Sequence, residues 1–270
     1  MDKNGDRTTS PPILAGKDYA AASVFEPANL LREARRQKDL PAIDVPTICL
    51  LDPDGDILRA LRREGAARRS PGWACYHTEL FEFEQQGIRF GIVGCAVGAS
   101  FAVLVAEQLF VCGCRLLVSM TSAGQIVDRG PPPYFVVIDR ALRDEGTSYH
   151  YLPPADFAAA DPELVDLALD ALATAGEPVC RGASWTTDAP FRETAEAIAR
   201  ARTRGILAVE MEAAALYACA RARAKPVLCI AHVTNQMAVA DGDFEKGEAA
   251  GARASLAVIA AVAAAWLDRR

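Results

Sequence analysis

The chain has 270 residues, of which 51% are hydrophobic and 24% are charged. This length fits one large domain or at most two small ones, and the composition supplies a sizeable core and excludes a largely disordered protein. Acidic residues outnumber basic ones, 35 against 29, for a formal net charge of -6. Nucleic-acid-binding proteins usually show a basic excess, so the sequence predicts no nucleic-acid partner.

The sequence gives no sign of a membrane segment or a metal site. The first ten residues are polar and charged and do not read as a signal peptide. The longest apolar stretch, from Val93 to Leu117, is interrupted by Glu107 and Gln108 and predicts no membrane span. Eight cysteines without a CxxC pair lie mostly in apolar runs, and three histidines lack metal-ligand spacing. We therefore expect a cytoplasmic protein without a metal or a membrane partner.

Strand and helix patterns alternate along the chain, which predicts a single α/β domain with some antiparallel pairing. Residues 1–20 are expected to form a flexible tail, and residues 21–270 the domain. Strands are expected over Thr47–Leu51, Leu80–Glu84, Ile88–Val93, Arg115–Met120, Tyr134–Asp139, Ile206–Val209 and Pro226–His232. Helices are expected over Pro27–Gln37, Asp56–Glu64, Ala99–Val111, Pro162–Ala175, Pro190–Arg200, Glu210–Ala224 and Glu248–Asp268.

Two polar segments follow predicted strands, where α/β proteins bind ligands. The first contains Gly94 and Gly98 and leads into a helix, so its backbone N–H groups can attract an anion. Its spacing fits neither a dinucleotide-binding fingerprint nor a P-loop, and a tight structural turn is the alternative. The second is Thr121-Ser122-Ala123-Gly124, whose hydroxyls suit an anion or a sugar. An ordinary Ser/Thr turn is the alternative there.

A third segment, Val209-Glu210-Met211-Glu212-Ala213, places two carboxylates around a methionine where a strand gives way to a helix. Acids in a first helical turn interact favourably with the helix dipole, so plain capping is one interpretation. Residues two apart point in different directions, so one carboxylate can cap the helix while the other faces a cleft. A carboxylate that accepts two hydrogen bonds suits the vicinal diol of ribose, and a methionine beside it would cover the apolar face of the sugar.

Together these segments resemble the nucleoside phosphorylase superfamily, which includes purine nucleoside phosphorylases, uridine phosphorylases and methylthioadenosine nucleosidases. The likeness runs from about Thr47 to the C-terminus, and the Glu210-Met211-Glu212 segment is its most specific part. The resemblance implies one α/β domain around a mixed, partly barrel-like sheet flanked by helices. It also implies cleavage of an N-glycosidic bond, in which phosphate or water attacks the anomeric carbon of an oxocarbenium-like ribosyl group.

The resemblance assigns roles to individual residues. Glu212 would bind the ribose hydroxyls, with Met211 and Glu210 in the same substrate-binding segment. Ser122, followed by Gly124, would match the hydroxyl residue that contacts phosphate, and the glycine loop with Gly94 and Gly98 would lie near the phosphate. Beyond the sugar, the segment from Asp188 to Arg192 would flank the base, and His77 could reach the phosphate or the sugar.

The chain departs from the family pattern where phosphate binds. Three arginines that usually hold phosphate correspond to Gly55, Thr78 and Ser119. Their loss would remove charge-assisted hydrogen bonds, each worth about 1.5–3 kcal/mol. The substitutes available are Arg140, Arg143 and His77, and surface or structural roles are the alternative for each.

A further departure concerns the leaving base. Purine-specific members carry an aspartate as general acid after the last core strand, and this chain has Asn235 there. An asparagine is more similar to uridine phosphorylase, in which hydrogen bonds stabilise the leaving base. We therefore expect catalysis by Glu212 and Asn235 on a nucleoside, uridine phosphorylase-like.

The co-substrate and the assembly complete the expectation. Phosphorolysis to free base and ribose 1-phosphate is placed first, with phosphate as co-substrate and no cofactor. Because the usual arginines are missing, hydrolysis by water stays open, and so does nucleoside binding without turnover. Family members complete each site with residues of a neighbouring subunit, so the resemblance also implies a homo-oligomer, a dimer or a trimer of dimers.

Overall fold

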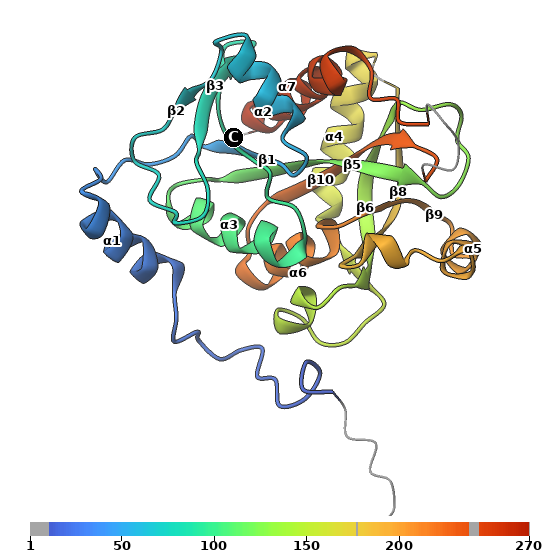
Figure 1. The fold of residues 1–270 in the computed structure, drawn as a ribbon, viewed down its shortest axis with the longest axis horizontal. Helices are drawn as coiled ribbons and strands as arrows, with labels where there is room; N and C mark the ends of the chain where they lie inside the picture. Colours follow the sequence, from blue (N-terminus) through green and yellow to red (C-terminus); the bar gives the residue numbers. More distant parts are fainter. Residues whose placement is uncertain (1–10, 177, 238–242, 270) are drawn as a thin grey trace, which may run out of the picture.

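The computed structural model describes residues 11–176, 178–237 and 243–269. Figure 1 shows a central sheet with helices on both of its faces. The strands are β1 (Ile48–Asp52), β2 (Arg68–Arg69), β3 (Phe81–Gln85), β4 (Ile88–Gly94), β5 (Leu116–Gln125), β6 (Tyr134–Asp144), β7 (Phe157–Ala159), β8 (Val179–Thr187), β9 (Ile206–Glu210) and β10 (Val227–Asn235). The α-helices are α1 (Pro27–Lys38), α2 (Asp56–Arg63), α3 (Ala99–Val111), α4 (Pro162–Ala175), α5 (Ala195–Thr203), α6 (Ala213–Arg223) and α7 (Ala252–Asp268). Short 3-10 turns span Thr147–His150 (η1), Pro190–Arg192 (η2) and Glu248–Gly251 (η3).

The sheet closes on itself over half of its width. Its strand order is β10-β6-β8-β9-β5-β1-β4-β3-β2, and β10 also pairs with β5. The strands β5, β10, β6, β8 and β9 therefore form a closed ring, and β1, β4, β3 and β2 extend it as an open sheet. Parallel pairs join β5 with β10 and β8 with β9, whereas β5 and β9 are antiparallel. The predicted single α/β domain with a mixed, partly barrel-like sheet is confirmed.

Two apolar layers bury the faces of the sheet. On one face, residues of α1, α3 and α6 pack on the strands, with Leu109 and Tyr217 fully buried. On the other face, α2, α4 and α7 cover the sheet, with Ile57, Val165 and Ile259 in the core. A smaller cluster around Trp185 packs residues of β8 and β9 against α5. Most of the stability of these helices comes from this burial, because isolated helices of such lengths are marginal in water.

The C-terminal helix shows why apolar composition does not define a membrane span. Residues Glu248–Asp268 are long and apolar enough to cross a bilayer by length and composition. Within the protein, 56% of that stretch is buried, and Val258, Ile259 and Val262 pack into the core. The helix is therefore accounted for as a core helix that packs on α4.

Most predicted elements are present, and the differences are informative. The expected hairpin is confirmed: β3 pairs with β4 in antiparallel fashion, and the turn residues Gln86 and Gly87 have positive φ, as a tight hairpin turn requires. Three predictions were wrong. The strand expected to end at Met120 continues to Gln125, so Thr121–Gly124 lies within β5 and does not follow it. The helix expected over Pro190–Arg200 is the turn η2 followed by α5, and the helix expected from Glu210 begins at Ala213, because β9 continues to Glu210. The strands β2, β7 and β8 were not predicted.

The N-terminal segment follows the surface of the domain. Residues 1–10 of the predicted tail lie outside the described residues. Residues 11–26 form no helix or strand, but they contact the turn η1. Lys17 Nζ lies 2.8 Å from His150 Nδ1, and the Tyr19 hydroxyl donates to the Tyr149 carbonyl at 3.4 Å. These contacts are exposed or half-buried, so each contributes little to stability.

Candidate active site

The site is centred on Glu212, which lies in a bend between β9 and α6. Its side chain is 1% exposed. Oε1 accepts a hydrogen bond of 2.7 Å from the backbone N–H of Gly98, and Oε2 accepts one of 3.0 Å from the Thr121 hydroxyl. Three predicted segments therefore meet at one carboxylate: the glycine loop, the Thr121-Ser122 segment of β5 and the Glu-Met-Glu bend. Burial and the neighbouring carboxylate of Glu210 raise the pKa of Glu212 to about 8.

Glu210 has a different environment, although it is only two residues away. One carboxylate oxygen accepts from the hydroxyls of Ser184 and Thr186 at 2.9 and 2.5 Å. The other accepts from the backbone N–H groups of Glu212 and Ala213, both at 2.7 Å. Four protein donors thus occupy the buried carboxylate, and they tie β8 to the N-terminus of α6. The side chain caps α6 and fixes the bend in which Glu212 lies.

Gly98 and Gly124 hold special positions around this carboxylate. Gly98 has φ +92°, which favours glycine, and it begins α3 with its N–H aimed at Glu212. A Cβ on Gly124 would stand 2.6 Å from the Met237 sulfur and 3.3 Å from Asn235 Oδ1. Gly124 therefore permits the close approach of β10 and its following loop. Gly94 pairs with Asp52 at the ends of β4 and β1.

Ser122 and Asn235 stand on the neighbouring strands β5 and β10. The Ser122 hydroxyl lies 2.9 Å from Thr234 Oγ1, and Asn235 pairs with Gly124 in the parallel ladder. Asn235 Oδ1 accepts the backbone N–H of Met237 at 2.9 Å. A backbone N–H can only donate, so this contact orients the amide and leaves Nδ2 as the group that donates. Nδ2 donates one hydrogen bond to Thr234 Oγ1 at 3.3 Å, so Asn235 retains one N–H for a ligand and has no titratable proton.

Met211 is half-buried in the bend beside Glu212. Within this chain, the other three predicted residues make no contact with the Glu212 carboxylate. Asp188 is exposed and accepts a 2.9 Å hydrogen bond from the Gly146 N–H, and Arg192 is exposed in η2. His77 is exposed in the loop before β3, with its ring 6.5 Å from that of Tyr76.

At the three positions where the resemblance places phosphate-binding arginines, the side chains carry no charge of their own, but Arg59 Nη1 lies 2.8 Å from where a Cβ on Gly55 would stand. A Cβ on Gly55 would stand 2.6 Å from Cys95 Sγ, so a larger residue does not fit without movement. The Thr78 hydroxyl accepts from the Trp73 indole N–H at 3.0 Å. Ser119 is fully buried, and within the described structure its hydroxyl has no hydrogen-bond partner.

The three cations considered as substitutes lie elsewhere. Arg143 is buried and donates to the Ser148 hydroxyl and to the carbonyls of Pro153 and Leu152, so it organises the loop after β6. Arg140 stacks on the Phe157 ring, 5.2 Å from its centroid. His77 is exposed, as described above. Among the described residues that line the cavity beside Ser122, none of these three occurs.

That cavity contains residues which the sequence patterns did not single out. It has a volume of about 20 Å³, enough for about one water molecule. Its polar lining comes from the chain between the end of β1 and the start of α2, from β5 and β10, from the loop before η3 and from α7: Asp52, Asp54, Asp56, Thr121, Ser122, His232, Lys246 and Ser255. Thr121 also donates to Glu212, so the cavity and the carboxylate are neighbours. Sequence spacing carries no signal for Lys246, which lies 190 residues after Asp56.

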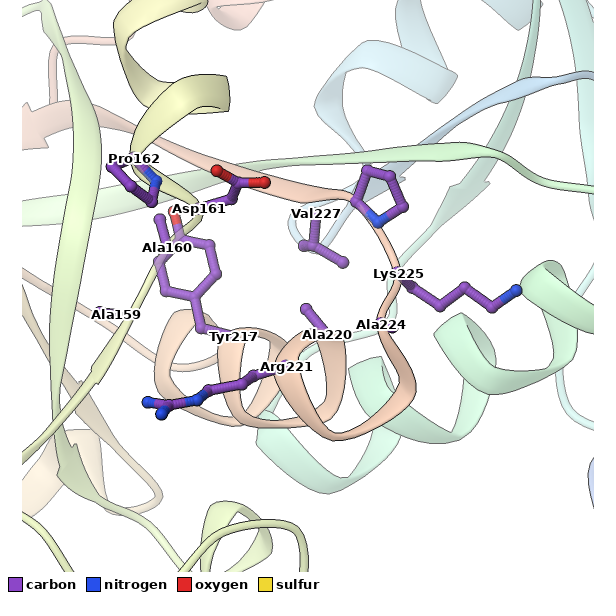
Figure 2. Close-up of a pocket in the computed structure, with 11 residues that line it drawn as sticks. Ala159, Ala160, Asp161, Pro162, Tyr217, Ala220, Arg221, Ala224, Lys225 and Val227 are labelled. Carbon is purple, nitrogen blue, oxygen red and sulfur yellow. The ribbon is translucent and has the colours of Figure 1, made fainter.

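A larger cavity lies away from this site. It has a volume of about 540 Å³ and lies between the C-terminal end of α6, the start of α4 and the first residues of β10 (Figure 2). Val227, at its edge, begins the strand that Asn235 ends, which places the two about 26 Å apart for a nine-residue strand. Its wall is largely alanine and proline, and none of the predicted site residues lines it.

Comparison with solved structures finds the same fold in other proteins. Similar folds occur in 5'-methylthioadenosine/S-adenosylhomocysteine nucleosidase of Neisseria meningitidis and in uridine phosphorylase of Vibrio fischeri. The nucleosidase gives a TM-score of 0.65 and 21% identity, with 81% of this chain and 99% of that chain covered. The phosphorylase gives 0.68 and 20%, with 87% and 94% covered. The fold is therefore that of nucleoside-cleaving enzymes.

The family assignment rests on sequence. The family model of the phosphorylase superfamily matches residues 30–265, and the chain belongs to that superfamily. A DeoD-type purine nucleoside phosphorylase of Colwellia psychrerythraea is 29% identical over 154 residues, which cover 56% of this chain and 66% of the relative. A second such enzyme, of Myxococcus xanthus, matches over 56% of its length. The chain thus spans between half and two thirds of the curated relatives it matches.

Proposed function

We propose that this protein cleaves the N-glycosidic bond of a nucleoside, with Glu212 holding the ribose. The observation that carries this proposal is the buried Glu212 carboxylate, positioned by Gly98 and Thr121. Each of its oxygens accepts one protein hydrogen bond and retains capacity for a second, which suits two adjacent hydroxyls. Superfamily membership and the activities of the relatives named above support the same reaction class.

Glu210 and Met211 support this role indirectly. We propose that Glu210 acts as a positioning residue, because its four hydrogen bonds are all made within the protein. Met211, half-buried beside Glu212, would pack on the apolar face of the sugar. The reaction then depends on Glu212 contacts that strengthen as positive charge develops on the ribosyl ring.

At the other end of the bond, we propose that Asn235 stabilises the leaving base. The Asn235 amide presents Nδ2 as a donor, which can hydrogen-bond an acceptor atom of the base while the bond to the sugar breaks. This favours a base that leaves without a full proton, as a uracil does, and supports a uridine phosphorylase-like preference. Asp188 and Arg192 would flank the base from the loop after β8.

The geometry of the cavity changes the expected nucleophile. The sequence favours phosphorolysis, because Arg140, Arg143 or His77 could replace the arginines that the resemblance leads one to expect. None of them is among the described residues lining the cavity beside Ser122, which instead contains Asp54 and Asp56. Carboxylates repel a phosphate dianion, whereas they can accept hydrogen bonds from a water molecule. We therefore propose that water attacks, with phosphorolysis as the alternative, and that no cofactor is needed.

The assembly remains a proposal. The Tyr76-His77-Thr78 loop is partly exposed, with Tyr76 43% exposed and His77 also at the surface. Exposed aromatic groups are a common feature of contacts between subunits. We propose a homo-oligomer in which this loop contacts a neighbouring copy, so that His77 serves the neighbour's site.

A nucleoside panel tests the reaction class. Uridine, thymidine, adenosine, inosine, guanosine and methylthioadenosine are incubated with the protein, and release of free base is followed by chromatography, with Glu212→Gln as the inactive reference. Release of at least one base by the native protein, strongly reduced in the folded variant, is expected. Binding of nucleosides by calorimetry without any release would instead establish a binding protein without turnover.

A further inference from the structure

Lys246 is held between two aspartates that come from the opposite end of the sequence. Its ammonium nitrogen lies 2.6 Å from Asp56 Oδ2 and 3.1 Å from Asp54 Oδ2. The lysine side chain is 26% exposed, and those of Asp56 and Asp54 are 18% and 35% exposed. These partly buried ion pairs are screened less than surface pairs, and the lysine is shared between two acceptors.

The same three side chains line the cavity beside Ser122 and Thr121. Among the described residues of that lining, Lys246 is the sole cation. His232 is the remaining basic group there, but burial, assisted by the charge of Lys246, lowers the pKa of His232 to about 4. The imidazole is therefore neutral at physiological pH and adds no positive charge.

The charges of the network cancel within a few ångströms. Asp56 also accepts from Arg59 at 2.6 Å, which leaves two cations opposite two carboxylates. Asp52, in the same lining, has its pKa raised to about 7 by burial and by the neighbouring Asp54 and Asp56 charges, so it adds partial negative charge. An anion entering this cavity would have to displace a carboxylate from Lys246 before gaining a cation of its own.

We propose that the Lys246–Asp54–Asp56 network selects the nucleophile, because it keeps the cation of the cavity bound to carboxylates and thereby excludes phosphate. The inference rests on the proposed function, since it concerns the nucleophile in the same site. Phosphate binding can still be tested without any nucleoside: the native cavity should not bind phosphate, and neutralising the two aspartates should free Lys246 to bind it. Lysine is well suited to that role as a compact, multiply donating cation.

The test measures the binding of inorganic phosphate, independently of any nucleoside. Native protein and the double variant Asp54→Asn/Asp56→Asn are titrated with phosphate by calorimetry and by ³¹P NMR line broadening. We expect no saturable binding to the native protein at phosphate concentrations of tens of millimolar. The double variant should bind phosphate with a Kd at least ~10-fold lower than that of the native protein, which corresponds to about 1.4 kcal/mol of binding free energy. Adding Lys246→Met to the double variant should abolish the gain.

A charge-matched control separates the network from net charge. The variant Asp156→Asn/Asp166→Asn removes two exposed carboxylates far from the cavity lining and should bind phosphate no better than the native protein. Circular dichroism and thermal unfolding confirm that each variant folds, and the single variant Asp54→Asn replaces the double one where it does not fold. Tight phosphate binding by the native protein would overturn the proposal. A folded aspartate variant that binds phosphate no better than the native protein would also overturn it.

A kinetic arm keeps this proposal distinct from the proposed function. If a nucleoside is cleaved, the double variant should form ribose 1-phosphate in phosphate buffer where the native protein forms ribose. If no nucleoside is cleaved by the native protein, the proposed function fails, while the phosphate titration still decides whether the network excludes the anion.

Discussion

Gly98 and Glu212 lie 114 residues apart in sequence, and the backbone N–H of the first donates a 2.7 Å hydrogen bond to the carboxylate of the second. This contact joins the N-terminus of α3 to the bend before α6. The positive end of the α3 dipole thus faces a buried acid, which offsets part of the cost of its charge. Substitution of either residue should therefore affect the same function.

Replacing Glu212 by glutamine separates function from stability. The amide oxygen can accept the Gly98 N–H and the amide nitrogen can donate to Thr121 Oγ1, so the fold should be retained. Because a neutral amide no longer balances charge on the ribosyl ring, we expect kcat/KM to fall by about 10²-fold or more. Steady-state kinetics on the cleaved nucleoside give the number. Near-native kcat/KM in a folded Glu212→Gln protein would remove Glu212 from the reaction.

Replacing Glu210 by alanine is the matched contrast. The change leaves the N–H groups of Glu212 and Ala213 and the hydroxyl of Ser184 without their acceptor. An unsatisfied buried polar group costs about 1–3 kcal/mol, so the free energy of unfolding should fall by at least that amount. Urea unfolding of both variants provides the comparison. A Glu210→Ala protein as stable as Glu212→Gln would show that the cap does not support α6.

The raised pKa of Glu212 predicts two opposite pH trends. A carboxyl whose pKa is about 8 when folded, against 4.5 ordinarily, binds its proton more tightly in the folded state. Stability therefore decreases as pH rises from about 4.5 to 8, and this contribution should be absent in Glu212→Gln. Activity should show the reverse, because ionised Glu212 accepts hydrogen bonds from ribose: kcat/KM should rise between pH 6 and 9.

Thermal unfolding and kinetics over that pH range measure both trends. Asp52 and Glu193 also have pKa values raised to about 7, the first mainly and the second solely by burial, so the difference between native and Glu212→Gln proteins is the informative quantity. A pH-independent difference in stability would contradict the buried, protonated state assigned to Glu212.

Replacing Asn235 by aspartate tests the choice of base. An aspartate retains an acceptor for the Met237 N–H and adds a group that can transfer a proton to a purine. We expect the ratio of kcat/KM for purine over pyrimidine nucleosides to increase about 10-fold or more. The nucleoside panel measured on both proteins provides the ratio, and an unchanged ratio would show that Asn235 does not contact the base.

Removing residues 1–20 tests the predicted domain boundary. The hydrogen bonds that join the described part of this segment to the domain are the exposed Lys17–His150 pair and the Tyr19 hydroxyl on the Tyr149 carbonyl, and the Ile13 side chain also lies close to Gly146. Pairs of this kind contribute about 0–1 kcal/mol, so the truncated protein should fold and unfold within a few degrees of the native Tm. Hydrogen exchange should increase only around residues 146–152. A truncated chain that fails to fold would place the segment within the domain.

The sequence predicts the framework where burial follows a simple period. The hairpin β3–β4, the strands β1 and β10 and the helix α4 have apolar patterns or turn residues that depend only on local structure. The strand β8 was missed because Ser184 and Thr186 are polar and completely buried. Their hydroxyls bond to Glu210, a residue more than twenty positions away, so burial of these residues depends on a contact that no local pattern reveals.

Some residues of the candidate site could be predicted from the sequence, and others could not. Glu212, Ser122 and the glycine loop could be found because the resemblance covers them, and Thr121 stands in the same motif as Ser122. Lys246 could not be found, since the loop that contains it has no motif and its partners are Asp54 and Asp56. The resemblance indicates from sequence that the usual arginines are absent, whereas the placement of Asp54, Asp56 and Lys246 beside Ser122 required the fold.

The identity of the nucleophile tests the account most directly. Base release is measured with the preferred nucleoside in phosphate-free buffer and at phosphate concentrations up to 50 mM, and ³¹P NMR of the products distinguishes ribose from ribose 1-phosphate. We predict the same rate at every phosphate concentration and free ribose as the sugar product. Release that requires phosphate, saturates at micromolar concentration and yields ribose 1-phosphate would contradict the assignment of the acidic cavity to water.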